Sequence, residues 1–94
     1  MRAPVTTWTL TLRTITGRHL DRQSDVADTP AAALQELVDA TAAAAAGADG
    51  AAVIVTAYLD GHCIGAMNSG ADVAAHDRLE RIHNSGRAWI ARTR

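Results

Sequence analysis

Two histidines flank a glutamate on segment 75–84, and this group has the clearest potential for metal chemistry in the chain. His76, Glu80 and His83 are spaced so that they share roughly one face of a helix, and Glu80 and His83 match the Glu-x-x-His pattern of carboxylate-bridged metal sites. Such sites need several carboxylates, however, and Glu36 is the only other glutamate. The two histidines are about 10 Å apart along a helix axis, too far to share one ion. We interpret the group as a solvated helix face and expect no metal or other cofactor.

A second chemically interesting pair is His62 and Cys63, which follow an Asp-Gly dipeptide in the stretch AYLDGHCIGA. Asp-Gly between two apolar segments predicts a hairpin with a type I′ turn, because both central residues of that turn need positive φ. His62 and Cys63 are then consecutive strand residues that point to opposite faces, so they form neither a shared metal site nor a nucleophile–base pair. We expect Cys63 to be a small buried residue and His62 to lie at the solvent edge.

Known catalytic motifs are absent from the rest of the sequence. The chain has no phosphate-binding Walker loop, no G-x-G-x-x-G fingerprint, no G-x-S-x-G elbow and no paired CxxC zinc motif. We therefore expect a protein without catalytic residues. A small enzyme or ligand-binding protein with an unrecognised site remains a third hypothesis.

Arginines near the C-terminus give the second hypothesis, which is nucleic-acid binding. The candidate residues are Arg78, Arg81, Arg87, Arg92 and Arg94, with Trp89 available to stack on a base. Three acids, Asp72, Asp77 and Glu80, share this region and repel phosphate, and the net charge of the chain is −1. In the alternative interpretation, Trp89 closes the core and the arginines solvate the surface.

Composition limits the class of protein. A chain of 94 residues predicts a single domain over 1–94 with a small core, and 48% hydrophobic residues are ordinary for a globular protein. One cysteine forms no internal disulfide, and apolar runs of about eight residues are too short to span a bilayer. We expect a cytoplasmic protein without a membrane partner. Abundant alanine and the absence of lysine are typical of a GC-rich genome, bacterial or phage.

Residues 6–26 predict the first of two β-hairpins. Segment 6–14 alternates, with Trp8, Leu10 and Leu12 on one face and threonines and Arg13 on the other. Ile15-Thr16-Gly17 suits a three-residue loop with a bulge at the glycine. This loop predicts a register in which Trp8 faces Ser24 and Leu12 faces Leu20, which matches the apolar sets of the two strands.

Two helices are predicted by apolar spacing and by capping residues. The first begins after Asp28 or Thr29, with Pro30 in its first turn, and ends at Gly47. The second begins with a capping box at Ser69 and ends at Gly86. The apolar face of this second helix is narrow and consists of Val73, His76, Leu79 and Ile82. For residues 87–94 we predict a short final strand, with a continued helix as the alternative.

The second hairpin, over 52–67, is apolar on both faces, which is typical of a strand pair that is covered on both sides. Its predicted register pairs Tyr58 with Cys63 and Ala57 with Ile64, and this places Ile54, Tyr58 and Met67 on one face. We expect an α+β fold in which two hairpins form a mainly antiparallel sheet with two helices, in the order ββαββα. The first helix covers the Trp8 face, and either the second helix or a partner subunit covers the opposite face of the second hairpin.

The leading functional hypothesis follows from the second hairpin, which has more apolar surface than one helix layer can cover. If the second helix leaves them uncovered, Ile54, Tyr58 and Met67 form an apolar patch that a second copy of the chain would bury. The sequence thus predicts a small non-catalytic protein-binding or regulatory module that self-associates as a homodimer and binds another protein.

Overall fold

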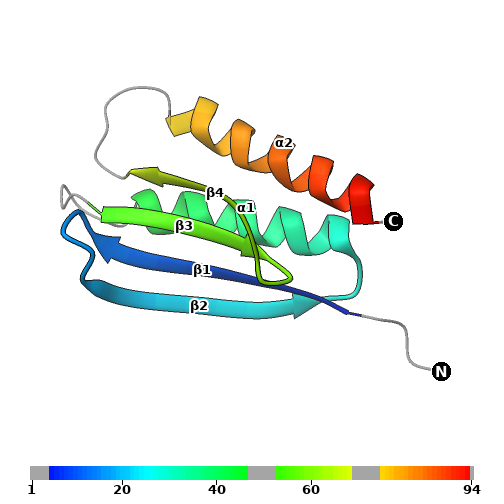
Figure 1. Cartoon of the computed structure of the whole chain (residues 1–94), viewed down its shortest axis with the longest axis horizontal. Coiled ribbons are helices and arrows are strands. Elements are labelled where there is room, and N and C mark those ends of the chain that lie inside the picture. The colour runs from blue at the N-terminus through cyan, green and yellow to red at the C-terminus, as the bar shows by residue number, and fades with distance from the viewer. Residues whose placement is uncertain (1–4, 47–52, 69–74, 94) are drawn as a thin grey trace.

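The computed structural model describes residues 5–46, 53–68 and 75–93, and within them the α+β fold and the order ββαββα are confirmed (Figure 1). The elements are β1 (Thr6–Thr14), β2 (His19–Ala27), α1 (Pro30–Ala46), β3 (Val53–Leu59), β4 (His62–Asn68) and α2 (Ala75–Thr93). These four strands form one antiparallel sheet in the order β2-β1-β3-β4. Neither helix in the described ranges is long and apolar enough to cross a membrane.

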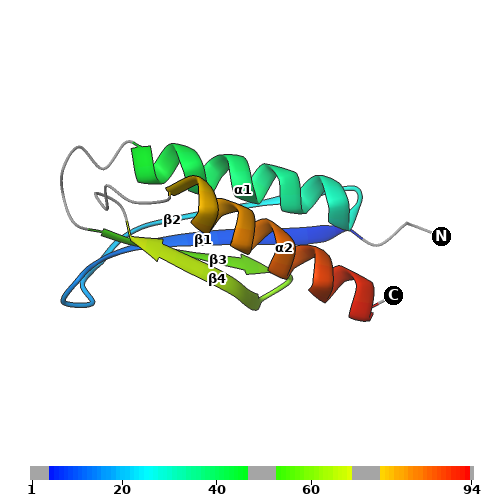
Figure 2. The same ribbon diagram turned by 90° about the horizontal axis from the view of Figure 1, so that it is seen from above.

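Both α1 and α2 lie on the same face of the sheet (Figure 2). Helix α1 packs across β1 and β3, as predicted, and α2 packs beside it against β4. Of the two predicted covers for the opposite face of the second hairpin, the second helix is wrong, because α2 lies beside α1; the partner subunit stays a prediction. The opposite face is therefore left without a helix over it in the described chain.

The core lies between the sheet and the two helices. Its strand residues alternate along β1 and β3, and its helix residues come mainly from α1; they include Trp8, Leu10, Val55, Ala57, Leu59, Leu34 and Leu37. The indole N–H of Trp8 donates to Glu36 Oε1 of α1 at 3.4 Å. Thr29 caps α1, because its Oγ1 accepts the Ala32 N–H at 3.1 Å.

The first hairpin has the predicted loop and a different register. Thr14 N–H donates to the Arg18 carbonyl at 2.8 Å, and Gly17 has a φ of 93°, so the three-residue loop is confirmed. A β-bulge between Leu12 and Arg13 then shifts the pairing, so that Leu12 faces Asp21 rather than Leu20. The predicted register was wrong beyond the loop, because the bulge changes which residues of β2 point toward the helices.

The second hairpin contains a bulge as well. Positive φ at Asp60 (50°) and Gly61 (79°) confirms the predicted turn, and Tyr58 faces Cys63 as expected. Beyond Tyr58 the pairing shifts, and Ala57 faces Gly65 instead of Ile64.

Beyond this second bulge, the side chains of β4 point to the face opposite to the one predicted for them. Val55 faces Met67, so Met67 points toward the helices and is only 2% exposed. The prediction that Met67 shares a face with Ile54 and Tyr58 is therefore wrong.

Helix α2 continues where the sequence predicted a stop. Gly86 does not end the helix, and residues 87–93 are helical rather than a strand. Gly86 is buried against α1 and β4: a Cβ atom built on it would lie 2.4 Å from Leu34 Cδ1 and 3.2 Å from Ile64 Cδ1. The glycine thus serves helix packing, and this tertiary contact overrides its low helix propensity.

Replacing Gly65 by alanine tests the bulge of β4. Gly65 has a φ of 154°, and an added Cβ would lie 2.9 Å from Ile82 Cγ1 of α2. We expect Gly65→Ala to lower the free energy of unfolding by about 2–4 kcal/mol, because backbone strain and overpacking add. Gly17→Ala is the matched control: its φ is also positive but its surroundings are open, so we expect a loss of only about 1–2 kcal/mol. Urea unfolding measures both, and equal losses would contradict the close packing of Gly65 on α2.

Candidate functional site

The sheet surface opposite α1 and α2 is the candidate site, and we call it the open face. Its positions follow from strand alternation and register, since the intervening residues of β1 and β3 lie in the core. They are Thr7, Thr9, Thr11, Arg13, His19, Arg22, Ser24, Val26, Ile54, Thr56, Tyr58, Cys63, Ala66 and Asn68. The open face thus combines hydroxyl groups and cationic groups with several apolar side chains.

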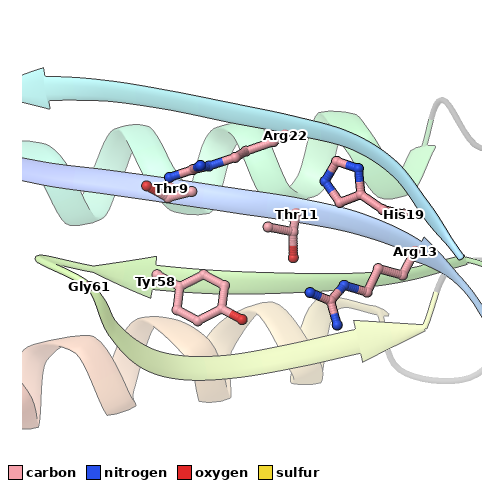
Figure 3. A pocket seen from close by; sticks show the side chains of 7 residues that line it. All are labelled: Thr9, Thr11, Arg13, His19, Arg22, Tyr58 and Gly61. Atoms are coloured by element: carbon pink, nitrogen blue, oxygen red, sulfur yellow. The ribbon is translucent and has the colours of Figure 1, made fainter. Parts of the chain in front are cut away.

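A hollow of about 340 Å³ lies on this face, over β1 and its two neighbouring strands (Figure 3). Its lining residues are Thr9, Thr11, Arg13, His19, Arg22, Tyr58 and Gly61. Figure 3 shows the two arginines on adjacent strands, with the Tyr58 ring between Gly61 and Arg13. The hollow therefore combines guanidinium groups, hydroxyl groups and aromatic rings.

Charge on the open face is of one sign. None of its strand positions in the described chain holds an Asp or Glu, and the Arg13 and Arg22 side chains form no ion pair or hydrogen bond there. Asp21 and Asp25 of β2 face Leu12 and Trp8, so they point to the helix side of the sheet. The two arginines consequently keep their full capacity to bind an anion.

The nearest acid along the chain is Asp60, in the turn that follows Tyr58. Its Oδ1 accepts the Thr7 N–H at 3.0 Å, and its own N–H donates to the Thr7 carbonyl at 2.7 Å. Asp60 thus joins the β3–β4 turn to β1 and makes no ion pair with either arginine of the hollow.

Hydroxyl groups of the open face differ in their hydrogen bonding. Thr9 Oγ1 and Ser24 Oγ lie 3.1 Å apart, and Ser24 also donates to the Trp8 carbonyl. Thr11 is nine-tenths buried, and its Oγ1 has no hydrogen-bond partner. Thr11 is therefore the hollow's buried hydroxyl that lacks a hydrogen-bond partner.

Two of the three candidate metal ligands, Glu80 and His83, have described side chains, and they form no ligand cluster. Glu80 and His83 line a groove between α1 and α2 together with Asp39, whose carboxylate accepts the Gln35 amide at 3.0 Å. The side chain of His76 lies outside the described residues. Among the described side chains, no group of three His, Cys, Asp or Glu residues is placed to hold a metal ion.

Four of the five C-terminal arginines lie along α2, away from the open face. Arg78 and Arg81 line a hollow of about 290 Å³ beside β4, Arg87 and Arg92 are exposed, and Arg94 lies outside the described residues. Trp89 is half-buried and stacks on His62, with ring centroids 5.4 Å apart. Because the His62 ring covers one face of Trp89, less of the indole is free to stack on a base.

The predicted self-association residues are separated by the structure. Ile54 and Tyr58 are half-buried on the open face, whereas Met67 lies in the core under the helices. Cys63 also lies on the open face, opposite Tyr58, and is exposed. The expectation that Cys63 is a buried residue is wrong, because α2 does not cover this side of β4.

Sequence reasoning missed Arg13, His19 and Arg22 as a group. The alternation of β1 had placed Arg13 on the face opposite Trp8, but the predicted register set Asp21 opposite Thr11 on that face. The bulge at Leu12 and Arg13 places Arg22 there instead. Recognising the bulge would have revealed a cationic face.

Comparisons with protein-family models, with curated proteins and with solved structures found no match to this chain. The chemistry of the open face must therefore be argued from its own residues.

The position of Cys63 predicts its reactivity. An exposed thiol reacts with an aqueous thiol reagent such as a dithiobis-nitrobenzoate without prior unfolding. We expect the native protein to release close to one equivalent of chromophore per chain, at a rate within about threefold of the urea-unfolded protein. Protection of the thiol that only denaturant removes would contradict the exposed placement of Cys63.

Proposed function

We propose that this protein is a small non-catalytic binding module whose open face binds single-stranded nucleic acid. The observation that carries the proposal is the set of unpaired cationic side chains, Arg13 and Arg22, beside Tyr58 on a face without acids. We expect the module to act in the cytoplasm, where its single cysteine remains a thiol.

The hydrogen-bonding chemistry of the face supports a phosphate-bearing partner. A guanidinium group presents a planar fork of N–H donors that fits phosphate oxygens, and threonine hydroxyl groups donate to the same oxygens. An extended strand of nucleic acid also offers bases, and an aromatic ring such as Tyr58 provides a surface on which one base stacks. An apolar partner would desolvate the unpaired arginines without offering them a hydrogen-bond acceptor, so this face does not suit a purely apolar contact.

The distribution of charge supports the proposal despite a net charge of −1. Binding of a polyanion depends on the local potential, and the acids of β2 point away from the face while Asp60 is bonded at its edge. No acidic residue therefore lies between the two arginines on the strands of the open face.

Salt dependence tests the proposal. We expect a fluorescent oligothymidylate of about ten nucleotides to bind at low salt and to dissociate as salt rises, because phosphate contacts release counterions. Arg13→Ala and Arg22→Ala should each weaken binding and reduce the slope of log K against log salt by about 0.7. Fluorescence anisotropy at several salt concentrations measures both quantities.

A double variant on α2, Arg87→Ala with Arg92→Ala, is the matched control for the double variant Arg13→Ala with Arg22→Ala, since it removes the same two charges from the other side of the molecule. It should leave the slope unchanged. A slope that falls in this control and not in the open-face variants would assign binding to α2, as the second hypothesis from the sequence did. No binding by the wild-type protein at low salt would rule out both sites.

A second candidate function is self-association as a homodimer, and Ile54 and Tyr58 on the open face favour it. Both side chains are half-buried, and Val26, at the end of the same face, is 53% exposed. A two-fold contact through this face would bury these side chains on both copies. The loss of Met67 from the patch, and the arginines within the face, weigh against a purely apolar contact.

Sedimentation at micromolar concentration tests this second candidate. If a dimer forms through the open face, Tyr58→Arg should shift it to monomer, because like charges would meet across the two-fold axis. Ala43→Arg, on the exposed side of α1, is the matched control, because it adds the same charge away from the open face. A wild-type protein that sediments as a monomer would exclude the homodimer at that concentration.

A further inference from the structure

We propose that Thr11 forms the base of an oxyanion subsite, in which its hydroxyl donates a hydrogen bond to one phosphate group held by Arg13 and Arg22. This inference rests on the proposed function and deepens it, since it assigns the point on the open face at which a phosphate oxygen is bound.

The inference starts from an unpaired hydroxyl. Among the buried side-chain nitrogens and oxygens of the described chain, only Thr11 Oγ1 lacks a hydrogen-bond partner. Thr41, which is fully buried in α1, shows the ordinary arrangement, because its hydroxyl donates to the Leu37 carbonyl at 2.7 Å. Buried polar groups in folded proteins are nearly always bonded, so we infer that the unpaired hydroxyl inside this hollow meets an acceptor supplied by a ligand.

The surroundings of Thr11 favour an anion as the acceptor. Arg22 lies opposite Thr11 on β2, and Arg13 is the next outward residue on β1. Figure 3 shows the Thr11 oxygen on the side of β1 that faces Tyr58 and Arg13. Two unpaired guanidinium groups attract a phosphate oxygen and orient it, while the hydroxyl supplies a further donor.

Access to the hydroxyl requires that the side chains around it move, and Arg13 is free to do so. Thr11 Oγ1 is covered by its neighbours, but Arg13 is exposed and makes no bond to the described residues. Its side chain can therefore turn toward a phosphate without breaking an interaction of the free protein. The volume of about 340 Å³ is in the range of small-ligand sites, so it takes a phosphate together with part of its sugar.

Thr11→Val tests the subsite, because valine keeps the shape of threonine and removes only the hydroxyl group. A buried hydroxyl without a partner destabilises the free protein, so we expect the variant to raise Tm by about 4 °C. The same change should weaken binding of the oligothymidylate of about ten nucleotides by about tenfold, since a hydrogen bond to a charged group is lost. Thr11→Ser keeps the hydroxyl group and should retain wild-type affinity.

The outcomes separate the subsite from the proposed function. A Tm that is unchanged or lower in Thr11→Val would mean that water already satisfies the hydroxyl, and would overturn the subsite. Unchanged oligothymidylate affinity in Thr11→Val, with weaker binding in Arg13→Ala, would also overturn it while leaving the open face as the binding surface.

Inorganic phosphate and a poly-glutamate peptide complete the test. One outcome is that the wild-type protein binds inorganic phosphate at Thr11, seen as a shift of its amide resonance, and does not bind oligothymidylate. That result would support the subsite and contradict nucleic-acid binding. Tighter binding of poly-glutamate than of oligothymidylate would overturn the phosphate assignment, since a carboxylate would then be the preferred anion.

Discussion

The packing of α1 and α2 on one face of the sheet is the constraint on which the rest of the structure depends. Gly86 allows this arrangement, because a side chain at that position would meet Leu34 of α1 and Ile64 of β4. The two helices share one core with the inward residues of β1 and β3, and the opposite face of these strands receives no helix. When helices cover only one face of an antiparallel sheet, the other face contacts solvent or a partner.

Much of the fold could be predicted from the sequence, because alternation and turn chemistry act locally. The Asp60-Gly61 turn, the loop ending at Gly17 and the Thr29 cap are all formed as the residue types require. The end of α2 could not be predicted in this way. Gly86 resembles a helix stop, and only its contact with Leu34 shows that it is a packing residue.

The candidate site was harder to predict, because two β-bulges decide which residues it contains. The bulge beside Leu12 places Arg22, not Asp21, across from Thr11, and the bulge beside Tyr58 moves Met67 into the core. A one-residue shift exchanges the two faces of a strand, so each bulge reverses the chemistry of the surface beyond it. Together they add Arg22 to the threonines and Arg13 that the sequence had predicted on this face of β1, and they remove Met67 from the apolar patch predicted on the second hairpin.

Backbone resonances followed during a titration with oligothymidylate test the central claim most directly, since they report every surface of the protein at once. The account predicts shifts confined to outward residues of β1, β2 and β3, centred on Thr11 and Arg22, with α2 unaffected. Shifts that cluster instead on Arg78, Arg81 and Arg87 of α2, or no shift at low salt, would contradict it.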